Sequence, residues 1–378
     1  MDLGSSIDYT IFVQRMSTFP FRKNWWKYLG ALLVIYSIIV GTMAKVGPGV
    51  VDVSPTHVDG RYDFEIEIEG YNTSFTKLEQ DKDQKNQLTV WIKIDKTFNR
   101  SVREKIIDDN HISCFFRPID LITDSTYSRT GSIVIEDVYH GIFIGPDMIN
   151  VDFTPDPDNG LGQLVSIGEP PRKKQLSYFS FPYRYILNET IRNLNFHVPM
   201  WFAMIAMLFM SFGYSIRFLN TKKPEHDYWA NGYAKVGLLF GLMGIATGMF
   251  WANFTWGTPW TNDPKLNGAA VAVLMYIAYQ ILRSSIEDDS LVGRISAIYN
   301  IFSFPIFIVL IIVLPRMADF SLHPGAGDSV GFNTYDLDSN LRKVFYPAVM
   351  GWILVAGWIS QVTVRIDKLT KQFEEWYS

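Results

Sequence analysis

The sequence predicts a mainly α membrane protein, in which a six-helix transmembrane bundle carries an inserted all-β, sandwich-like extracytoplasmic domain. Three observations lead to this prediction. Six apolar runs approach or reach the length of about 17–25 residues that a helix needs to cross a bilayer. The polar stretch between the first two runs alternates apolar and polar residues, as half-buried strands do. Lysine and arginine gather on alternate short loops, which sets the orientation of the runs.

The six apolar runs define the domain boundaries. They cover residues 28–46, 198–216, 236–254, 268–282, 295–314 and 344–364. The fifth run contains Pro305, which a membrane helix tolerates where neighbouring groups satisfy the freed carbonyl. We therefore expect a cytoplasmic segment 1–27, a transmembrane helix 28–47, an inserted β-rich domain 48–190, a five-helix membrane domain 191–366 and a cytoplasmic tail 367–378.

The first apolar run has two interpretations. The small residues at 41–44 follow an apolar stretch, as they do at the cleavage site of a signal peptide. The length of the run and the paired Trp25 and Trp26, which are typical of an interfacial anchor, favour a helix that is retained.

Strand patterns are concentrated in the inserted domain. In residues 63–70, Phe64, Ile66 and Ile68 alternate with acidic residues, and residues 87–94 alternate in the same way. Residues 132–138 and 141–144 are further β-rich runs, and residues 164–167 are a short one. Gly, Pro, Asp and Asn between the runs indicate an antiparallel sheet. We expect a small sandwich that folds as a separate module.

Basic residues distinguish the two sides of the membrane. One set of loops and termini is rich in them: Arg15, Arg22, Lys23, Lys27, Arg217, Lys222, Lys223, Lys235, Arg283, Arg294, Arg365, Lys368 and Lys371. The alternate short loops carry only Lys265, Arg316, Arg342 and Lys343. By the positive-inside rule, both termini are expected in the cytoplasm, and residues 48–190 and the loops around Trp256 and His323 are expected outside.

Charge and cysteine content exclude several classes of function. The net charge of −4 argues against a nucleic-acid partner, which would require a concentrated basic face. Cys114 is the only cysteine, so a disulfide within the chain, a C-x-x-C redox pair and a thiolate metal cluster are all excluded. The lipid bilayer is the one partner that composition itself predicts.

Two of the six histidines are predicted at the same membrane face. His197 lies in the segment FHVPMW at the outer end of the second run, and His323 lies in SLHPGAG between the fifth and sixth runs. Two neutral imidazoles from separate segments can take both axial positions of a heme iron. By themselves the residues favour the simpler interpretation, because an interfacial histidine is more often a polar anchor. For His57, His111 and His140 solvated or structural roles are favoured, and His226 belongs to a charged cytoplasmic loop.

The loop between the third and fourth runs is rich in tryptophan. Its sequence from residue 251 to 265 is WANFTWGTPWTNDPK. An aromatic belt at the membrane interface explains such a composition, and the residues alone favour that explanation. The other interpretation is an aromatic platform for the face of a porphyrin, with Lys265 beside a propionate.

These motifs resemble a known family. The run Trp256-Gly257-Thr258-Pro259-Trp260-Thr261-Asn262-Asp263 is similar to the signature W-G-x-W-W-x-W-D of membrane proteins that handle heme in cytochrome c maturation. Among these, the chain resembles most the heme exporter protein C family of the Ccm system. That family has six spans, with one histidine opening the second and another in the last outer loop. His197 and His323 match those two positions.

The sequence departs from the family pattern in two places. Pro259 and Asn262 replace tryptophans of the signature. The family joins its first two spans by a short loop, whereas this chain has residues 48–190 there. The resemblance covers residues 25–46 and 184–366, and it assigns no role to the inserted domain.

The resemblance implies transient binding of heme b at the outer face of a bacterial inner membrane. His197 and His323 would be the axial ligands, and the rest of the site would comprise Trp256, Gly257, Trp260, Asp263 and Lys265. The expected partners are a periplasmic heme chaperone, the subunits of an ATP-binding-cassette transporter and a small membrane partner. The chain is expected to be a handling and transport protein and not an enzyme.

Three other functions are compatible with parts of this sequence. A heme lyase of the other cytochrome c maturation system also has a tryptophan-rich loop, but that family usually has more helices and further histidines within its spans. A membrane-anchored receptor or scaffold would use the β-rich domain to bind a ligand, and it would leave the placement of histidine and tryptophan unexplained. A redox enzyme such as a quinol oxidase is the least favoured, because one pair of imidazoles provides no second cofactor for electron exit.

Overall fold

The computed structural model describes residues 21–80, 88–95, 97–119, 127–153, 179–183, 187–318, 321, 337 and 339–377. His323, the expected short strand 164–167 and most of the expected cytoplasmic segment 1–27 lie outside these residues. The chain divides into two compact units. The β unit is Ala44–Ile191, and the helical unit combines Met1–Met43 with Arg192–Ser378.

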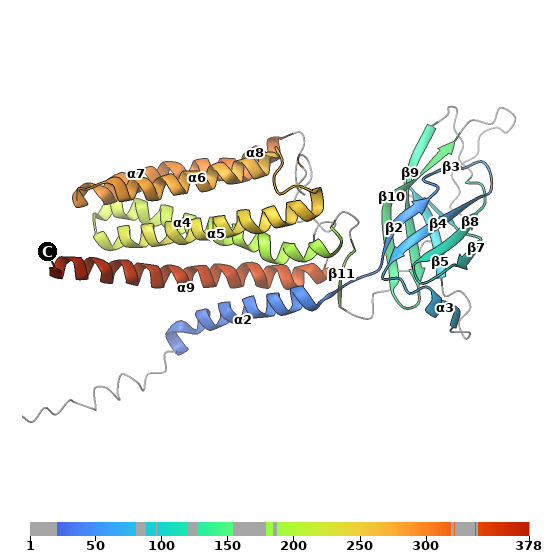
Figure 1. Ribbon diagram of the computed structural model, residues 1–378, viewed down its shortest axis with the longest axis horizontal. Helices are drawn as coiled ribbons and strands as arrows, with labels where there is room; N and C mark the ends of the chain where they lie inside the picture. Colours follow the sequence, from blue (N-terminus) through green and yellow to red (C-terminus); the bar gives the residue numbers. More distant parts are fainter. Residues whose placement is uncertain are drawn as a thin grey trace, which may run out of the picture. The chain divides into compact units, whose positions relative to one another are not determined.

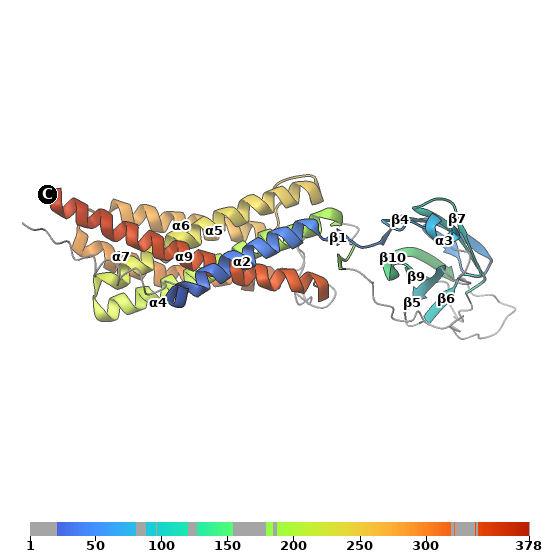
Figure 2. The same cartoon turned by 90° about the horizontal axis from the view of Figure 1, so that it is seen from below.

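Within the described residues, six helical segments are long and apolar enough to cross a membrane, which confirms the predicted number of spans. They are α2 (Phe21–Met43), η1 with α4 (Asn188–Asn193 and Leu194–Thr221), α5 (Pro224–Trp256), α6 (Pro264–Ser285), α7 with η2 and α8 (Asp289–Ile308, Val309–Val313 and Leu314–Met317) and α9 (Ser339–Tyr377). Figures 1 and 2 show these helices running alongside one another.

Helix α4 has a central place in the helical unit. It packs against α5, α7 and α9, while α2 packs chiefly against α9. The fifth span changes to a π-helical turn at Val309–Val313, between Pro305 and Pro315. A π-helical turn within an α-helix often lies next to a functional site.

Charged side chains join the helices at the end of the unit where α4 ends and α5 begins. Arg283 of α6 pairs with Asp227 of α5, and both side chains are mostly buried. Lys235 Nζ of α5 lies 2.8 Å from Asp367 Oδ2 of α9. His197 is near the start of α4 and therefore lies at the opposite end of that helix.

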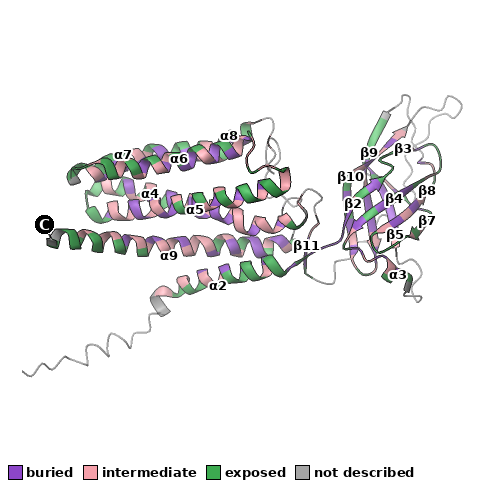
Figure 3. Cartoon of the chain, in the orientation of Figure 1, coloured by how far each residue is buried: buried purple, intermediate pink, exposed green. Residues whose placement is uncertain are grey.

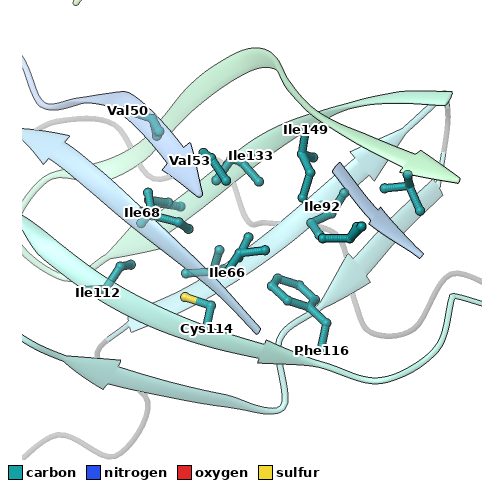
Figure 4. Close-up of a cluster of buried hydrophobic side chains, with 14 of the residues drawn as sticks. Val50, Val53, Ile66, Ile68, Ile92, Ile112, Cys114, Phe116, Ile133 and Ile149 are labelled. Carbon is teal, nitrogen blue, oxygen red and sulfur yellow. The ribbon is translucent and has the colours of Figure 1, made fainter. Parts of the chain in front are cut away.

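The β unit contains two large sheets that face each other and a separate pair of short strands. The five-stranded sheet has the order β3-β10-β9-β5-β6, from β3 (His57–Asp59), β10 (Gly141–Phe153), β9 (Tyr127–Asp137), β5 (Leu88–Ile94) and β6 (Thr97–Arg100). The four-stranded sheet has the order β2-β4-β8-β7, from β2 (Gly49–Ser54), β4 (Phe64–Tyr71), β8 (His111–Phe116) and β7 (Arg103–Ile106). Both sheets contribute side chains to one core, whose labelled members include Ile66, Ile92 and Ile133 (Figure 4). The predicted β-rich region is confirmed.

Some details differ from the sequence predictions. The first helix ends at Met43, and Lys45–Val46 forms strand β1, which pairs with β11 (Ser180–Phe181). That pairing and the pairing of β3 with β10 are parallel, so the unit is not purely antiparallel. Both join segments that are far apart in the chain, which leaves room for the long connection that parallel strands need.

Strand β10 also continues beyond the expected run 141–144. Gly145 and Pro146 are typical of a turn. Instead, the register shifts between Gly145 and Ile149, and Asp147 adopts a positive φ of 55°. A bulge accommodates the missing N–H of Pro146, so the strand resumes and reaches Phe153.

Candidate functional site

A row of glycines on α5 allows α4 to approach closely. A Cβ atom at any of these positions would lie within 2.7–2.8 Å of an α4 side chain, closer than real Cβ contacts come. The pairs are Gly237 with Leu208, Gly241 with Met204, Gly244 with Trp201 and Gly248 with His197. Small residues at a helix interface give membrane helices the close packing that holds them together. This packing positions His197.

Both ring nitrogens of His197 have partners in the helical unit. Nδ1 lies 3.1 Å from the hydroxyl oxygen of Thr247 on α5. The indole Nε1 of Trp201, one helical turn further along α4, donates to His197 Nε2 at 3.3 Å. The two rings meet edge to face, with centroids 6.2 Å apart. His197 is therefore oriented by two separate contacts.

His197 lines a cleft between α4, α5, α6 and the π-helical turn. The cleft has a volume of about 160 Å³, and its walls are His197, Trp201, Gly244, Ile245, Gly248, Trp260, Lys265, Leu266, Ala269 and Ile311. Pockets that enclose a small-molecule ligand usually measure about 300–1,000 Å³. The described cleft is therefore smaller than a pocket that encloses a whole small-molecule ligand.

The tryptophan-rich loop is shaped by a cap at each end. Helix α5 ends at Trp256, and Gly257 adopts a φ of +73°, a conformation that favours glycine. Asp263 is 3% exposed and caps α6, since its carboxylate accepts a bond of 2.8 Å from the backbone N–H of Lys265. These caps hold Trp260 and Lys265 at the cleft.

Asp263 also connects this loop to the segment that precedes His323. Its second carboxylate oxygen accepts a hydrogen bond of 2.8 Å from the hydroxyl of Ser321. Ser321 is two residues before His323 in the chain. His323 itself lies outside the described residues, but this contact shows that the loop between the fifth and sixth spans reaches the tryptophan-rich loop.

The site residues that the sequence predicts separate into two groups. His197, Trp260 and Lys265 line one cleft, although they come from different parts of the chain. Trp256 instead packs edge to face on Trp251, with centroids 4.9 Å apart. Of the described residues that the sequence predicts for the site, Trp256, Gly257 and Asp263 do not line the cleft. The last two shape the loop from outside the cleft.

Thr247 and the cleft glycines were not singled out by sequence analysis. Gly237, Gly241, Gly244 and Gly248 recur at a helical spacing, which is a visible sign of close packing against another helix. Thr247 carries no such sign. Its hydroxyl bonds the carbonyl of Met243 one turn earlier, as threonine commonly does within a helix.

Of the three histidines of the β unit, His57 lies in β3, whereas His111 and His140 each contact an aspartate of a turn. His111 Nδ1 lies 2.9 Å from Asp108, and His140 Nδ1 lies 2.9 Å from Asp137, in both cases three residues earlier. The hydrogen bond that the His111 ring donates to the Asp108 carboxylate raises the pKa of His111. Within the described part of the chain, no group of three or more His, Cys, Asp or Glu residues could hold a metal ion.

Comparisons with known proteins relate part of the helical unit to proteins of cytochrome c assembly. Residues 184–318 match the family model described as "Cytochrome C assembly protein", which covers α4, α5, α6 and α7. The β unit's sheets and α9 lie outside that match.

Three relatives have related names. A "Putative cytochrome c biosynthesis ccmC-like mitochondrial protein" of Marchantia polymorpha is 32% identical over 103 residues, which are 27% of this chain and 45% of the relative. "Heme exporter protein C" of Paracoccus denitrificans is 25% identical over 152 residues, 40% of this chain and 63% of the relative. "Cytochrome c biogenesis protein CcsA" of Pelargonium hortorum is 30% identical over 92 residues, 24% of this chain and 29% of the relative. The chain thus spans less than two thirds of each.

Proposed function

We propose that the helical unit binds heme b transiently at the outer face of a bacterial inner membrane and delivers it for cytochrome c assembly. The observation that carries this proposal is the cleft, which is lined by His197 of α4 and by Trp260 and Lys265 of the tryptophan-rich loop. An imidazole provides an iron ligand, an indole provides a stacking face, and an ammonium group can pair with a propionate. The matched family and the names of the relatives support the same role.

His323 is proposed as the second axial ligand. The hydrogen bond between Ser321 and Asp263 supports this assignment, because it ties the segment next to His323 to the loop that carries Trp260 and Lys265. Heme held between two loops and a shallow cleft can leave quickly, since deep burial slows dissociation. That property suits a protein that gives heme to a periplasmic chaperone and acts beside an ATP-binding-cassette transporter and a small membrane partner. In this proposal the chain handles heme and is not an enzyme.

An optical spectrum of detergent-purified protein tests this function. With added heme, the protein should show the Soret band of a low-spin, bis-histidine centre. His197→Ala and His323→Ala should each change the ligation and weaken heme retention. His57→Ala, His111→Ala and His140→Ala are matched controls and should behave like the wild type. The absence of a Soret band in the wild-type protein would favour the receptor or scaffold interpretation.

Orientation is a separate part of the proposal. The basic residues at the end where α4 meets α5 predict that this end faces the cytoplasm, and that the cleft and the β unit face outward. Reporter fusions after Lys174 and after Lys371 should therefore report opposite compartments. If both fusions reported the same compartment, the proposed outer position of the heme site would be wrong.

A further inference from the structure

The hydrogen bonds around His197 determine which of its nitrogens carries the proton. The indole nitrogen of Trp201 can only donate, so His197 Nε2 must accept and has no hydrogen. In a neutral ring the proton then lies on Nδ1, which donates to the Thr247 hydroxyl oxygen. Thr247 is able to accept because its own hydrogen points to the Met243 carbonyl, 2.9 Å away.

This tautomer is the one in which Nε2 can bind iron. A metal-bound histidine generally donates its other ring N–H to a fixed acceptor, which sets the ring orientation. Thr247 provides that acceptor. A neutral hydroxyl raises the basicity of the imidazole less than a carboxylate would, so it suits a ligand from which heme must depart.

The indole N–H of Trp201 uses the lone pair of His197 Nε2 that iron would need. Nε2 has one lone pair, and the indole N–H and an iron atom cannot both use it. At 3.3 Å the hydrogen bond is longer than the usual 2.9–3.0 Å, so it is easily broken. Trp201 also lines the cleft and lies over Gly244, where a Cβ atom would come within 2.8 Å of the indole.

Resting on the proposed heme-binding function, we propose that the Trp201 indole is a displaceable latch on His197 Nε2. Thr247 is the positioning residue that orients the His197 ring. In the heme-free protein Trp201 holds Nε2 in the correct tautomer and covers it. Heme that enters must break the hydrogen bond between the Trp201 indole and His197 Nε2. When heme leaves, that hydrogen bond forms again. The latch therefore lowers the affinity for heme and favours its release.

Substitutions at the two positions should have opposite effects. Trp201→Phe keeps an aromatic ring but removes the donor, so heme should bind tighter by roughly 2- to 10-fold, the effect of losing one competing neutral hydrogen bond. Thr247→Val removes the acceptor for Nδ1 and should weaken heme binding by a similar factor. Thr247→Ser keeps the hydroxyl and should bind heme with the wild-type affinity.

Matched controls come from positions away from the cleft. Trp352 packs on Phe240, and Thr363 bonds the carbonyl of Ile359 within α9. Trp352→Phe and Thr363→Val should leave the heme titration unchanged. Unchanged or weaker binding in Trp201→Phe, measured in a protein whose wild type does bind heme, would overturn the latch while leaving the proposed function intact.

A second measurement needs no heme. The ¹⁵N chemical shifts of His197 in the heme-free, full-length protein, assigned by comparison with His197→Ala, distinguish the two tautomers. We expect an Nδ1–H, Nε2-bare imidazole, which Thr247→Val should convert to a mixture. An Nε2–H ring in the wild type would overturn the inference directly. A wild type with the expected tautomer but without a Soret band on heme addition would instead overturn the proposed function, and the latch with it.

Discussion

The β unit and the helical unit each bury an apolar core, but they expose different kinds of side chain. In the β unit, Ile66 and Ile92 are fully buried, while the acidic residues of β4 point outward. In the helical unit, Phe254 and Phe302 are 76% and 70% exposed, while Asn300 is completely buried. Figure 3 shows exposed positions along the outward faces of the helices.

This contrast reflects the solvent around each unit. Water drives apolar side chains into the β core, so that core accounts for much of the unit's stability. Lipid gives apolar side chains no reason to leave the surface, and membrane helices are held instead by close packing of small residues and by hydrogen bonds between helices. The same substitution should therefore have different consequences in the two units.

The largest effect is expected from truncation in the β core. Ile66→Ala should lower the free energy of unfolding of the β unit by about 2–5 kcal/mol, because it leaves a cavity. The matched change on a lipid-facing surface is Ile306→Ala, where the side chain is 52% exposed. It should change stability by less than about 0.5 kcal/mol. Equal costs would show that the contrast between the units is wrong.

The reactivity of the Cys114 thiol measures the stability of the β unit alone. It is the only cysteine of the chain, is fully buried, and lies directly opposite Ile66 in the pairing of β4 with β8. Burial raises the pKa of its thiol well above the usual range, so the reactive thiolate is rare while the unit is folded. The rate of maleimide labelling in native buffer should increase strongly in Ile66→Ala and stay at the wild-type value in Ile306→Ala.

The next largest effect is expected at the glycine row. Gly248→Ala places a Cβ atom 2.7 Å from His197 Cε1 and should lower the stability of the helical unit by about 1–3 kcal/mol. Gly213 is the control, because its Cβ atom would meet nothing within 4 Å. Gly213→Ala should be neutral or stabilise by up to about 1 kcal/mol.

Thermal unfolding followed by circular dichroism measures both glycine variants. Cys114 labelling should be the same in both, because the change is confined to the helical unit. If Gly248→Ala unfolds at the wild-type temperature and leaves the heme spectrum unaltered, α4 and α5 are not in the close contact described above.

The sequence was most informative about features that depend on local composition. Long apolar runs identify the spans, since the requirement for a lipid-facing surface is visible in any window of sequence. The ends of the helices are not visible in this way: α5 begins at Pro224, three turns before its apolar run starts at Val236, because those turns are polar. Strand β8 was also missed. Ile112, Cys114 and Phe116 point inward there, but Phe115 on the outer face obscures the alternation.

The site was only partly accessible to sequence reasoning, for a different reason. Trp260 and Lys265 belong to a motif, and a motif can be read along the chain. Thr247 has meaning only after α4 packs on α5, because an ordinary threonine then becomes the partner of His197. The glycine spacing predicts close packing of α5 against another helix, but it does not identify α4 as that helix.

A smaller effect is expected from a buried polar residue of the helical unit. Asn300 Nδ2 donates to the hydroxyls of Ser211 and Ser215, at 2.7 and 2.9 Å. Hydrogen bonds between membrane helices contribute about 0.6 kcal/mol on average. Asn300→Leu should therefore lower the stability of the helical unit by less than about 1.5 kcal/mol, as measured by thermal unfolding. Ser211→Ala with Ser215→Ala should have a similar effect, and a loss of several kcal/mol would mean that polar contacts dominate the unit.

The smallest effect is expected from pH at the exposed turn between β7 and β8. The hydrogen bond with Asp108 raises the pKa of His111, so this stabilisation is complete below the unfolded pKa of about 6.5 and disappears as pH rises through the folded value. The pKa of Asp108 is lowered, chiefly by the backbone N–H of Asn110, so its contribution is lost as acid protonates it. Protection of Cys114 from labelling should therefore decrease slightly at pH values above and below a window of about 4–6.5, once the labelling rate is corrected for the intrinsic thiolate fraction.

Asp108→Asn keeps an oxygen for the backbone N–H groups but removes the charge, so it should flatten the high-pH side of this profile. Added salt should have the same effect, because both side chains are exposed and their attraction is screened. An equally steep profile in Asp108→Asn would assign the pH dependence to other groups.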